Sequence, residues 1–318
     1  MSQSGGSELG DGTLPHFVVN LPAPDITRWL AGNTGVPGFT TIAGAQPGPH
    51  VVVTALIHGN ELAGAIVLDG WLRAGVRLSC GRLTVGFANI DAFLRFDPAH
   101  PTASRFVDED LNRLWDPAVL DGPRRSSELD RARAMRPLID EADYLLDLHS
   151  MLWPSDPLIL SGPTGKGRAL GQMIGEPGLV VADHGHVSGA RLIDYHPFTG
   201  PGPAAAALVE AGQHWQTPTV DCARTCVDSL LSATGLVPGP RAAGPVRLAE
   251  VTVAVTAATS AFAFVRSFRG GDVIAERNTL IALDGMTEIR TPHDDCMLVM
   301  PSLRPSRGHT AVRLARFL

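Results

Sequence analysis

The chain has 318 residues, of which 44% are hydrophobic and 18% are charged. This length accommodates one large hydrophobic core and a small accessory domain. The net charge of −6 argues against nucleic acid or a membrane surface as a partner, because both would favour a basic patch. No apolar stretch reaches transmembrane length, and the N-terminus lacks the blocks of a signal peptide.

The four cysteines are too few and too scattered for a disulfide framework. We therefore expect a reduced, cytoplasmic protein. The sequence is compatible with a homo-oligomer but contains no signal that fixes the oligomeric state.

Residues 1–13 are predicted to form a disordered leader. Short apolar runs then alternate with helical stretches as far as Thr234, which predicts a layered α/β domain with a largely parallel sheet. The expected strands are Val51–Ile57, Leu83–Ala88, Tyr144–Leu148, Leu158–Leu160, Leu179–Ala182 and Ala205–Val209. The expected helices are Glu61–Ala74, Glu128–Glu141 with a capping box at Ser127-x-x-Asp130, and one that begins at Pro218.

The pattern changes after Gly235, where a Pro- and Gly-rich linker over residues 236–245 is followed by short β-type runs. These runs are Val246–Thr256, Phe262–Phe268, Val273–Ala275, Thr279–Leu283, Cys296–Met300 and Ala311–Arg316. They predict a small all-β domain. We therefore divide the chain into a hydrolase domain over residues 14–238 and a C-terminal β domain over residues 239–318.

The first expected strand ends immediately before His58-Gly-Asn-Glu61. Side chains at positions i and i+3 of a helix share a face, so this imidazole and this carboxylate can bind one cation. Such pairs also arise by chance, and a helix start with a surface acid is the alternative for the pair alone.

A second apolar run carries Asp147 and ends at His149. Strand side chains alternate, so these two residues point the same way. An acid inside an apolar strand is costly without a partner. We expect Asp147 to fix the tautomer of a ligand histidine, with His58 as the expected partner.

A third apolar run ends at Glu210. Ligands bind at the carboxyl ends of parallel strands, so these three strand ends predict one site. His58, Glu61 and His149 form a His₂Glu set with an open position, which is the arrangement of a catalytic zinc ion, one per chain. Glu210 is then the expected general base for the bound water, with a structural acid as the alternative.

Four ordered motifs carry a family resemblance: His58-Gly-Asn-Glu61, Asp110-Leu-Asn-Arg113, Asp147-Leu-His149 and Leu208-Val-Glu210-Ala-Gly. With them, nearly the whole chain resembles the succinylglutamate desuccinylase/aspartoacylase family of the zinc carboxypeptidase superfamily. The resemblance implies a three-layer α/β/α zinc-carboxypeptidase-like fold with a small C-terminal β domain. It also implies zinc held by His58, Glu61 and His149, with Glu210 as base and proton shuttle.

The resemblance further implies that Asn112 and Arg113 bind a substrate carboxylate, which suits the planar fork of an arginine. An ion pair of Arg113 with Asp108 or Asp110 is the alternative. In the Gly189–His196 stretch, Arg191 is the best additional carboxylate binder, although an ordinary loop is equally compatible. For the nearby His184 and His186, we favour a loop role over a second metal site.

The chain departs from the family pattern at Asn89-Ile-Asp91-Ala92, where the resemblance implies an arginine that polarises the scissile carbonyl. Asp91 cannot stabilise an oxyanion, and Arg95 and Arg105 are the candidates to replace the missing arginine. If Asp91 faces the pocket, it would disfavour N-acetylaspartate and favour a cationic or neutral amine portion, such as a diamino acid.

We therefore expect a zinc-dependent hydrolase that cleaves the amide of a small, carboxylate-bearing N-acyl amino acid or related amide. In this mechanism Glu210 activates the zinc-bound water. The alternatives are a zinc carboxypeptidase acting on peptides and a metal-binding protein without catalysis. An open cleft would favour the former, and the presence of Glu210 argues against the latter.

Overall fold

A computed structural model describes residues 15–239 and 244–318 of the chain. The predicted leader over residues 1–13 lies outside this part of the chain. Among the described residues, no helix combines the length and the apolar character that a bilayer crossing requires.

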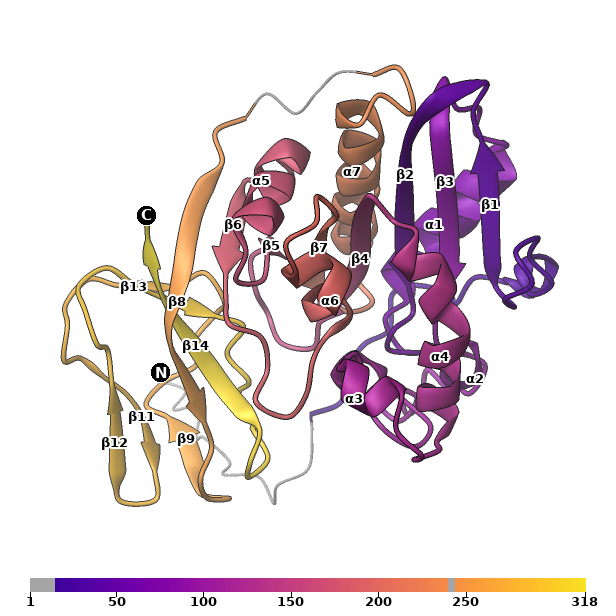
Figure 1. Cartoon of the computed structure of the whole chain (residues 1–318). Helices are drawn as coiled ribbons and strands as arrows, with labels where there is room; N and C mark the ends of the chain where they lie inside the picture. Colours follow the sequence, from indigo (N-terminus) through magenta and orange to yellow (C-terminus); the bar gives the residue numbers. More distant parts are fainter. Residues whose placement is uncertain (1–14, 240–243) are drawn as a thin grey trace, which may run out of the picture.

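The centre of the fold is a block of parallel strands that belongs to an 11-stranded sheet (Figure 1). In this block β2 (Gln46–Ala55) lies between β3 (Cys80–Phe87) and β4 (Tyr144–Met151), and β7 (Ala205–Gln213) pairs with β4. These apolar runs form strands because both of their faces are buried. The remaining strands of the predicted hydrolase domain are β1 (Phe39–Ala43), which was not predicted, β5 (Leu158–Leu160) and β6 (Leu179–Ala182).

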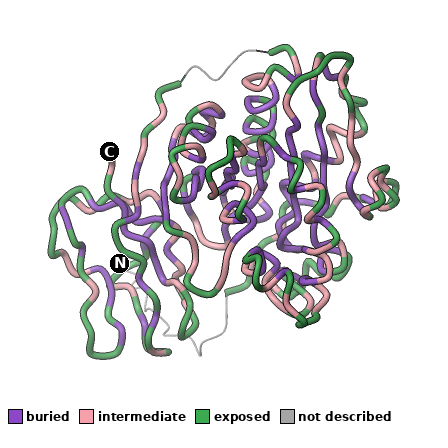
Figure 2. Tube along the Cα trace, viewed as in Figure 1, coloured by how far each residue is buried: buried purple, intermediate pink, exposed green. Residues whose placement is uncertain are grey.

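Helices cover both faces of the sheet, so the predicted three-layer α/β/α architecture is confirmed. On one face, α1 (Leu62–Ala74), α5 (Gly165–Ile174) and α7 (Thr217–Ala233) enclose a large apolar core. On the other face, α4 (Ser127–Asp140) encloses a second core. The short elements are α2 (Ile90–Phe93), α3 (Pro117–Leu120), α6 (His196–Thr199), η1 (Thr27–Trp29), η2 (Leu111–Arg113) and η3 (Leu192–Asp194). Figure 2 shows the buried trace running along the central strands between these layers.

The start of α4 differs by one residue from the predicted capping box. The N-cap is Ser126, which has extended backbone angles and whose side chain accepts a hydrogen bond from the backbone N–H of Leu129. Ser127 is already the first helical residue. Two adjacent serines precede the helix, and the residue with extended backbone becomes the cap.

The C-terminal strands continue the large sheet. β8 (Arg247–Thr256) pairs in parallel with β6, and β14 (Thr310–Phe317), β13 (Cys296–Val299) and β10 (Val273–Ile274) follow in antiparallel order. A separate three-stranded sheet contains β9 (Phe262–Phe264), β11 (Leu280–Asp284) and β12 (Thr287–Arg290). The predicted β character of this region is confirmed, whereas its separation as a domain at residue 239 stays a prediction.

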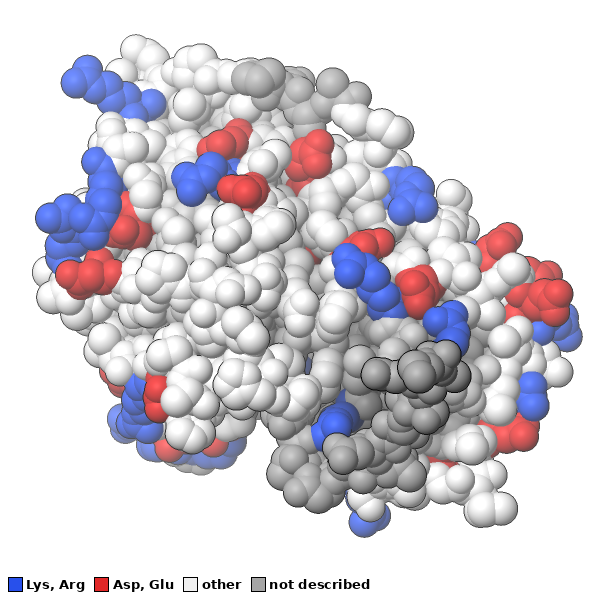
Figure 3. Space-filling view, turned by 180° about the vertical axis from the view of Figure 1, so that it is seen from behind, with Lys and Arg blue, Asp and Glu red and all other residues white. Residues whose placement is uncertain are grey.

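Charged side chains of both signs lie interspersed in small groups on the face shown in Figure 3. Mixed groups of this kind partly neutralise one another and give no extended basic surface on that face. The prediction that no nucleic acid binds remains a prediction.

Two glycines in α1 have opposite surroundings and provide a test of the packing. A Cβ atom on Gly64 would lie 2.8 Å from the Cβ of Leu148 and 2.9 Å from the Cβ of Ala55, whereas one on Gly70 would meet only the Arg224 guanidinium, at 3.8 Å. We expect Gly64→Ala to lower the free energy of unfolding by about 1–3 kcal/mol through overpacking. Gly70→Ala should raise it by about 0.4–1 kcal/mol. Chemical denaturation checks both values, and equal effects at the two positions would contradict this packing.

Candidate active site

The polar residues predicted from three strand ends converge at one edge of the sheet. His58 and Glu61 follow β2, while His149 on β4 and Glu210 on β7 are direct partners in the sheet register. All four line a cavity of about 590 Å³. Carboxyl ends of parallel strands meet at this edge, which explains why residues far apart in the chain form one site.

The loop between β2 and α1 has a tightly constrained backbone. Leu56 has a φ of 61°, a left-handed conformation that is rare for a non-glycine residue. A Cβ on Gly59 would lie 2.5 Å from the backbone of Ala92 and Phe93, so only glycine fits there. The loop that carries His58 is therefore fixed against α2.

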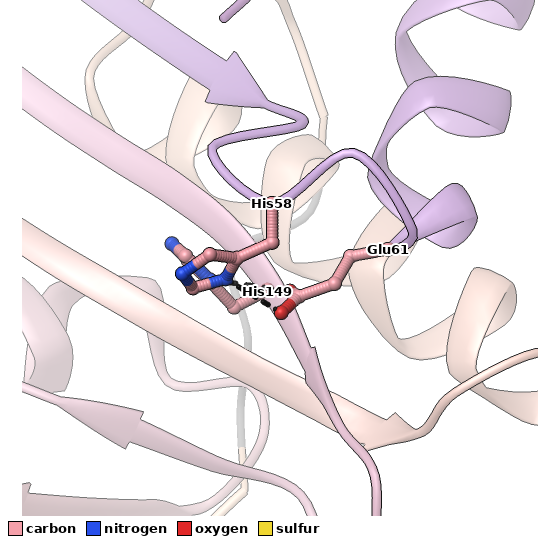
Figure 4. Close-up of side chains that lie close together, drawn as sticks. All are labelled: His58, Glu61 and His149. Carbon is pink, nitrogen blue, oxygen red and sulfur yellow. Dashed lines mark hydrogen bonds and ion pairs between the residues drawn. The ribbon is translucent and has the colours of Figure 1, made fainter. Parts of the chain in front are cut away.

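The two histidines face one carboxylate, that of Glu61 (Figure 4). His58 Nδ1 lies 2.7 Å from Glu61 Oε1, and His149 Nδ1 lies 3.2 Å from Glu61 Oε2. One donor atom from each residue fits within 4.8 Å of the others, and all three residues are buried. Among the described residues this is the only group found with metal-binding spacing. Two imidazole nitrogens and one carboxylate form a donor set suited to a divalent transition metal ion.

Each histidine also contacts an acid through its other ring nitrogen. Asp147 Oδ2 lies 2.7 Å from His149 Nε2, and Asp110 Oδ1 lies 3.0 Å from His58 Nε2. The expected pairing of Asp147 with His58 is therefore wrong. Asp147 and His149 are neighbours on one face of β4, so the closer histidine takes the bond, while Asp110 serves His58.

Further hydrogen bonds hold the carboxylates of this cluster in place. The Thr54 hydroxyl donates to Asp147 Oδ1 over 2.7 Å, and the Ser150 N–H donates to Glu61 Oε2 over 2.8 Å. Burial would raise the pKa of Glu61, but His58 and His149 hold it well below its usual range. The acid is therefore an anion that is ready to bind a cation.

Glu210 is buried, and its Oε2 atom has no hydrogen-bond partner among the described residues. Burial raises the pKa of its carboxyl to about 8, and the nearby Glu61 adds to this effect. An unpartnered buried carboxyl is costly, and sites of this kind are frequent where an acid has a chemical task.

A cation that the sequence did not locate lies beside the histidines. Arg105 approaches His58 Nε2 to 2.7 Å, Asp110 to 3.1 Å and Glu61 to 3.6 Å. Asp91, in contrast, is exposed at the start of α2 and does not line the cavity. Arg105, one of the two candidates to replace the arginine expected at Asp91, lines the cavity, whereas an effect of Asp91 on the amine portion of the substrate loses its structural basis.

Asn112 and Arg113 both line the cavity. The Asn112 side-chain oxygen accepts a hydrogen bond from Leu192 N over 2.8 Å, and Arg113 Nε donates to Ser188 Oγ over 3.1 Å. Arg113 also lies 3.8 Å from Asp110, which is the ion pair weighed as an alternative. Asn112 is thus tied to the start of η3 and Arg113 to the loop before it, and both residues line the cavity.

The guanidinium of Arg191 is bound by two acids. It donates to Asp183 over 2.7 and 2.9 Å and to Asp194 over 2.7 and 3.0 Å. Although Arg191 lines the cavity, these bonds make it a poor candidate for a substrate carboxylate. Arg313 on β14 also lines the cavity, and no sequence motif singles it out.

The histidines outside the metal-type cluster differ in their surroundings. His214 is buried in the cavity wall, where its Nδ1 lies 2.6 Å from Ser150 Oγ and burial lowers its pKa to about 4. His186 lines the cavity, whereas His184 is exposed. His293, in the C-terminal β region, is buried, and its Nε2 lies 3.0 Å from the Thr252 hydroxyl.

Comparison with known proteins agrees with these motifs. Residues 47–155 match the family model of the succinylglutamate desuccinylase/aspartoacylase catalytic domain. This segment contains the first two strands of the site together with Asp110, Asn112 and Arg113. Residues 47–155 therefore resemble the catalytic domain of this family.

Similar curated proteins include human N-acyl-aromatic-L-amino acid amidohydrolase (carboxylate-forming), which is 30% identical over 118 residues, and mouse aspartoacylase, which is 28% identical over 121 residues. These matches cover 33% and 35% of this chain and 34% and 37% of the relatives, so they span about a third of each protein. The solved structure of succinylglutamate desuccinylase from Vibrio cholerae has a TM-score of 0.67 at 19% identity, covering 88% of this chain and 85% of that one. At 19% identity, this structural similarity supports the fold of the chain and not its activity.

The two acids behind the histidines should act on metal affinity. We expect Asp147→Asn and Asp110→Asn each to weaken metal binding by about 10–100-fold, because each removes the acceptor that orients a ligand imidazole. Titration with a chelator and circular dichroism would measure affinity and fold separately. An unchanged affinity in either variant would exclude that acid from the metal site.

Burial of Glu210 should make the metal-free protein lose stability as pH rises. A carboxyl with a pKa of about 8 when folded and an ordinary pKa of 4.5 when unfolded keeps its proton longer in the folded state. Its stabilising contribution is therefore complete below pH 4.5 and is lost as pH rises to about 8. Between these two pH values, the slope of the unfolding free energy against pH should be more negative in the wild type than in Glu210→Gln. The expected difference is up to about 1.4 kcal/mol per pH unit. Denaturation of the chelator-treated proteins between pH 5 and 8.5 measures this difference, and parallel curves would refute it.

Proposed function

We propose that the protein is a zinc-dependent amidohydrolase that removes the acyl group from a small N-acyl amino acid or related amide. The observation that carries this proposal is Glu210, a buried carboxyl whose Oε2 atom has no hydrogen-bond partner among the described residues and which lies opposite His149 at a three-residue cluster with metal-binding spacing. A purely structural metal site has no need for such a group.

Zinc is the ion that fits best, because His58, Glu61 and His149 supply the two imidazoles and one carboxylate typical of catalytic zinc sites. When bound, zinc would acidify a water molecule and polarise a carbonyl group. The single cluster of this kind in the part of the chain that the structure describes supports the prediction of one zinc ion per chain.

Glu210 is suited to carry a proton between the attacking water and the leaving amine. Its Oε2 has no partner among the described residues, so this atom is available to accept a proton, and its raised pKa favours holding that proton near neutral pH until the leaving amine takes it. Its position on β7 is fixed by the sheet, which limits the motion of the carboxyl.

Two arginines have complementary tasks in this proposal. Arg105 lies beside Glu61 and His58, where its charge would stabilise negative charge that develops on the scissile carbonyl oxygen. Arg113, together with Asn112, would bind a substrate carboxylate and hold the amide in register.

The names of the relatives, an N-acyl amino acid amidohydrolase and an aspartoacylase, support cleavage of an acyl amide. The rival is a carboxypeptidase that would need an open cleft for a polypeptide. Residues from the C-terminal strands and their loops, including Met300, Thr310 and Arg313, form part of the cavity wall and favour a small substrate. We therefore rank deacylation above peptide trimming.

The test is a screen of N-acetyl, N-succinyl and N-formyl amino acids with zinc-loaded protein, alongside short peptides. We expect Glu210→Gln to keep its zinc but to lose about 10²–10⁴-fold in kcat, because it removes the proton carrier. His149→Ala is the comparison that should lose zinc and activity together. Near-normal turnover by Glu210→Gln would exclude it as the base, and cleavage of peptides alone would favour the rival.

A further inference from the structure

We infer that Glu128, at the start of α4, is a positioning residue for the active site. It holds the chain segment that carries Arg105 and Asp110, the cation and the acid that contact His58. The inference rests on the proposed function, because it assigns to Glu128 the placement of two residues that serve the proposed zinc site. Glu128 acts through these residues, since it does not itself line the cavity.

The carboxylate of Glu128 is fully buried, and four N–H groups donate to it. Its Oε1 accepts hydrogen bonds from Val107 N over 2.6 Å and from Asn89 Nδ2 over 3.0 Å. Its Oε2 accepts from Asp108 N over 3.0 Å and from Glu109 N over 3.2 Å. All four donors are neutral amide groups. A carboxylate, which only accepts hydrogen bonds, is therefore the side chain that fits them.

The three backbone donors are consecutive and belong to residues 101–110, a segment that contains no helix or strand. Such a segment has no ladder of hydrogen bonds for its N–H groups, and successive N–H groups that converge form an anion-binding concavity. Glu128 therefore satisfies this segment in place of a neighbouring strand. A contact in the reverse direction strengthens the attachment, because Asp108 accepts a hydrogen bond from Ser127 N over 2.7 Å.

The two ends of the clamped stretch reach the same histidine. Arg105 and Asp110 flank the three bound amides, and their side chains lie 2.7 Å and 3.0 Å from His58 Nε2. The backbone oxygen of Arg105 also accepts a hydrogen bond from Gly59 N over 3.0 Å. The segment thus contacts the loop that carries His58 at three points, and each point lies close in sequence to an amide that Glu128 binds.

The fourth donor, Asn89, connects Glu128 with the other side of that loop. The side chain of Asn89 donates to Glu128, while its backbone N–H donates to Leu56 O over 2.7 Å. Leu56 is the residue with left-handed backbone angles just before His58. A single carboxylate therefore connects the two segments that determine where His58 lies.

The alternative is that Glu128 only stabilises α4, because an acid in the first turn of a helix interacts favourably with the helix dipole. Asp130 lies in the same turn and can fill that role with 41% of its side chain exposed. Burial is not needed for this interaction and costs free energy, since the charge leaves water. The amides that Glu128 binds explain its burial, whereas the dipole does not.

The experiment measures the zinc affinity of the whole protein by competition with a chelator. In Glu128→Gln an amide nitrogen replaces one oxygen and faces N–H donors, so the segment loses part of its attachment. We expect an affinity at least about threefold lower, within the roughly 10–100-fold loss expected from Asp110→Asn. In an Asp110→Asn background, Glu128→Gln should change the affinity less than about twofold, because the acid through which it acts is already absent.

Two substitutions on the same helix are the controls. Asp130→Asn removes the other acid of the first turn, and Ile139→Val lowers stability through the buried face of α4. Both should keep the zinc affinity of the wild type. If Glu128→Gln does not fold, Glu128→Asp keeps the charge, withdraws the carboxylate by one methylene and should show the same dependence on Asp110.

Three outcomes of the zinc measurement would overturn the inference. The first is an unchanged affinity in Glu128→Gln. The second is an equal loss in the wild-type and Asp110→Asn backgrounds, which would show that Glu128 does not act through Asp110. The third is a loss in Ile139→Val as large as in Glu128→Gln, which would indicate a general effect of stability.

Hydrogen exchange of the metal-free protein gives a second readout that needs no zinc. The Gly59 amide donates to Arg105 O, so its protection reports whether the segment stays attached to the His58 loop. We expect this amide to exchange at least about tenfold faster in Glu128→Gln than in the wild type, and at the wild-type rate in Asp130→Asn. Equal rates in Glu128→Gln and the wild type would contradict the inference.

These measurements separate the inference from the proposed function. If the wild type binds no zinc or cleaves no N-acyl amino acid, the proposed function is wrong, and exchange at Gly59 still decides the role of Glu128. If a substrate is cleaved, Glu128→Gln should lower kcat with little change in KM, because Arg105 acts on charge that develops in the transition state. An unchanged kcat would refute the role of Glu128 while the deacylase activity stands.

Discussion

The site depends on one buried anion, the carboxylate of Glu61, which contacts both histidines. A carboxylate that is 3% exposed is tolerated only with close partners, and here these are His58, His149 and the N–H of Ser150. Each histidine then needs a defined tautomer. Asp110 and Asp147 fix it by contacting the Nε2 atoms of His58 and His149, on the side of each ring away from Glu61. The resulting network spans two loops and one strand, so the positions of these elements are fixed by charge pairing as well as by apolar packing.

The sequence predicted those features of the fold that depend on local pattern. Buried strands with polar residues at their ends gave β2, β4 and β7 and, with them, His58, Glu61, His149 and Glu210. The boundaries shifted by a few residues because strand ends follow hydrogen bonding in the sheet, which an apolar run does not reveal. β1 was missed because its sequence, Phe39–Ala43, contains two threonines and only modest apolar character.

The partners within the site were harder to predict, because they depend on the path of loops. Asp110 lies 52 positions after His58 in the chain, and Arg105 reaches the same histidine from a segment without regular structure. Arg191 was a reasonable candidate from its place in the Gly189–His196 stretch, but its guanidinium is bound by two nearby acids. The position of Arg313 in the cavity could not be predicted from the sequence, because only the pairing of β14 with β8 and β13 brings this residue to the site.

The continuous sheet has a consequence for dividing this chain. Because β8 pairs with β6, a fragment that ends after α7 would leave the β6 edge with unpaired backbone groups next to an apolar face. The same cut would remove one wall of the cavity. A recombinant catalytic fragment would therefore be prone to self-association through that edge, and chimaeras with relatives should exchange the strands from β8 onward as one block together with β6.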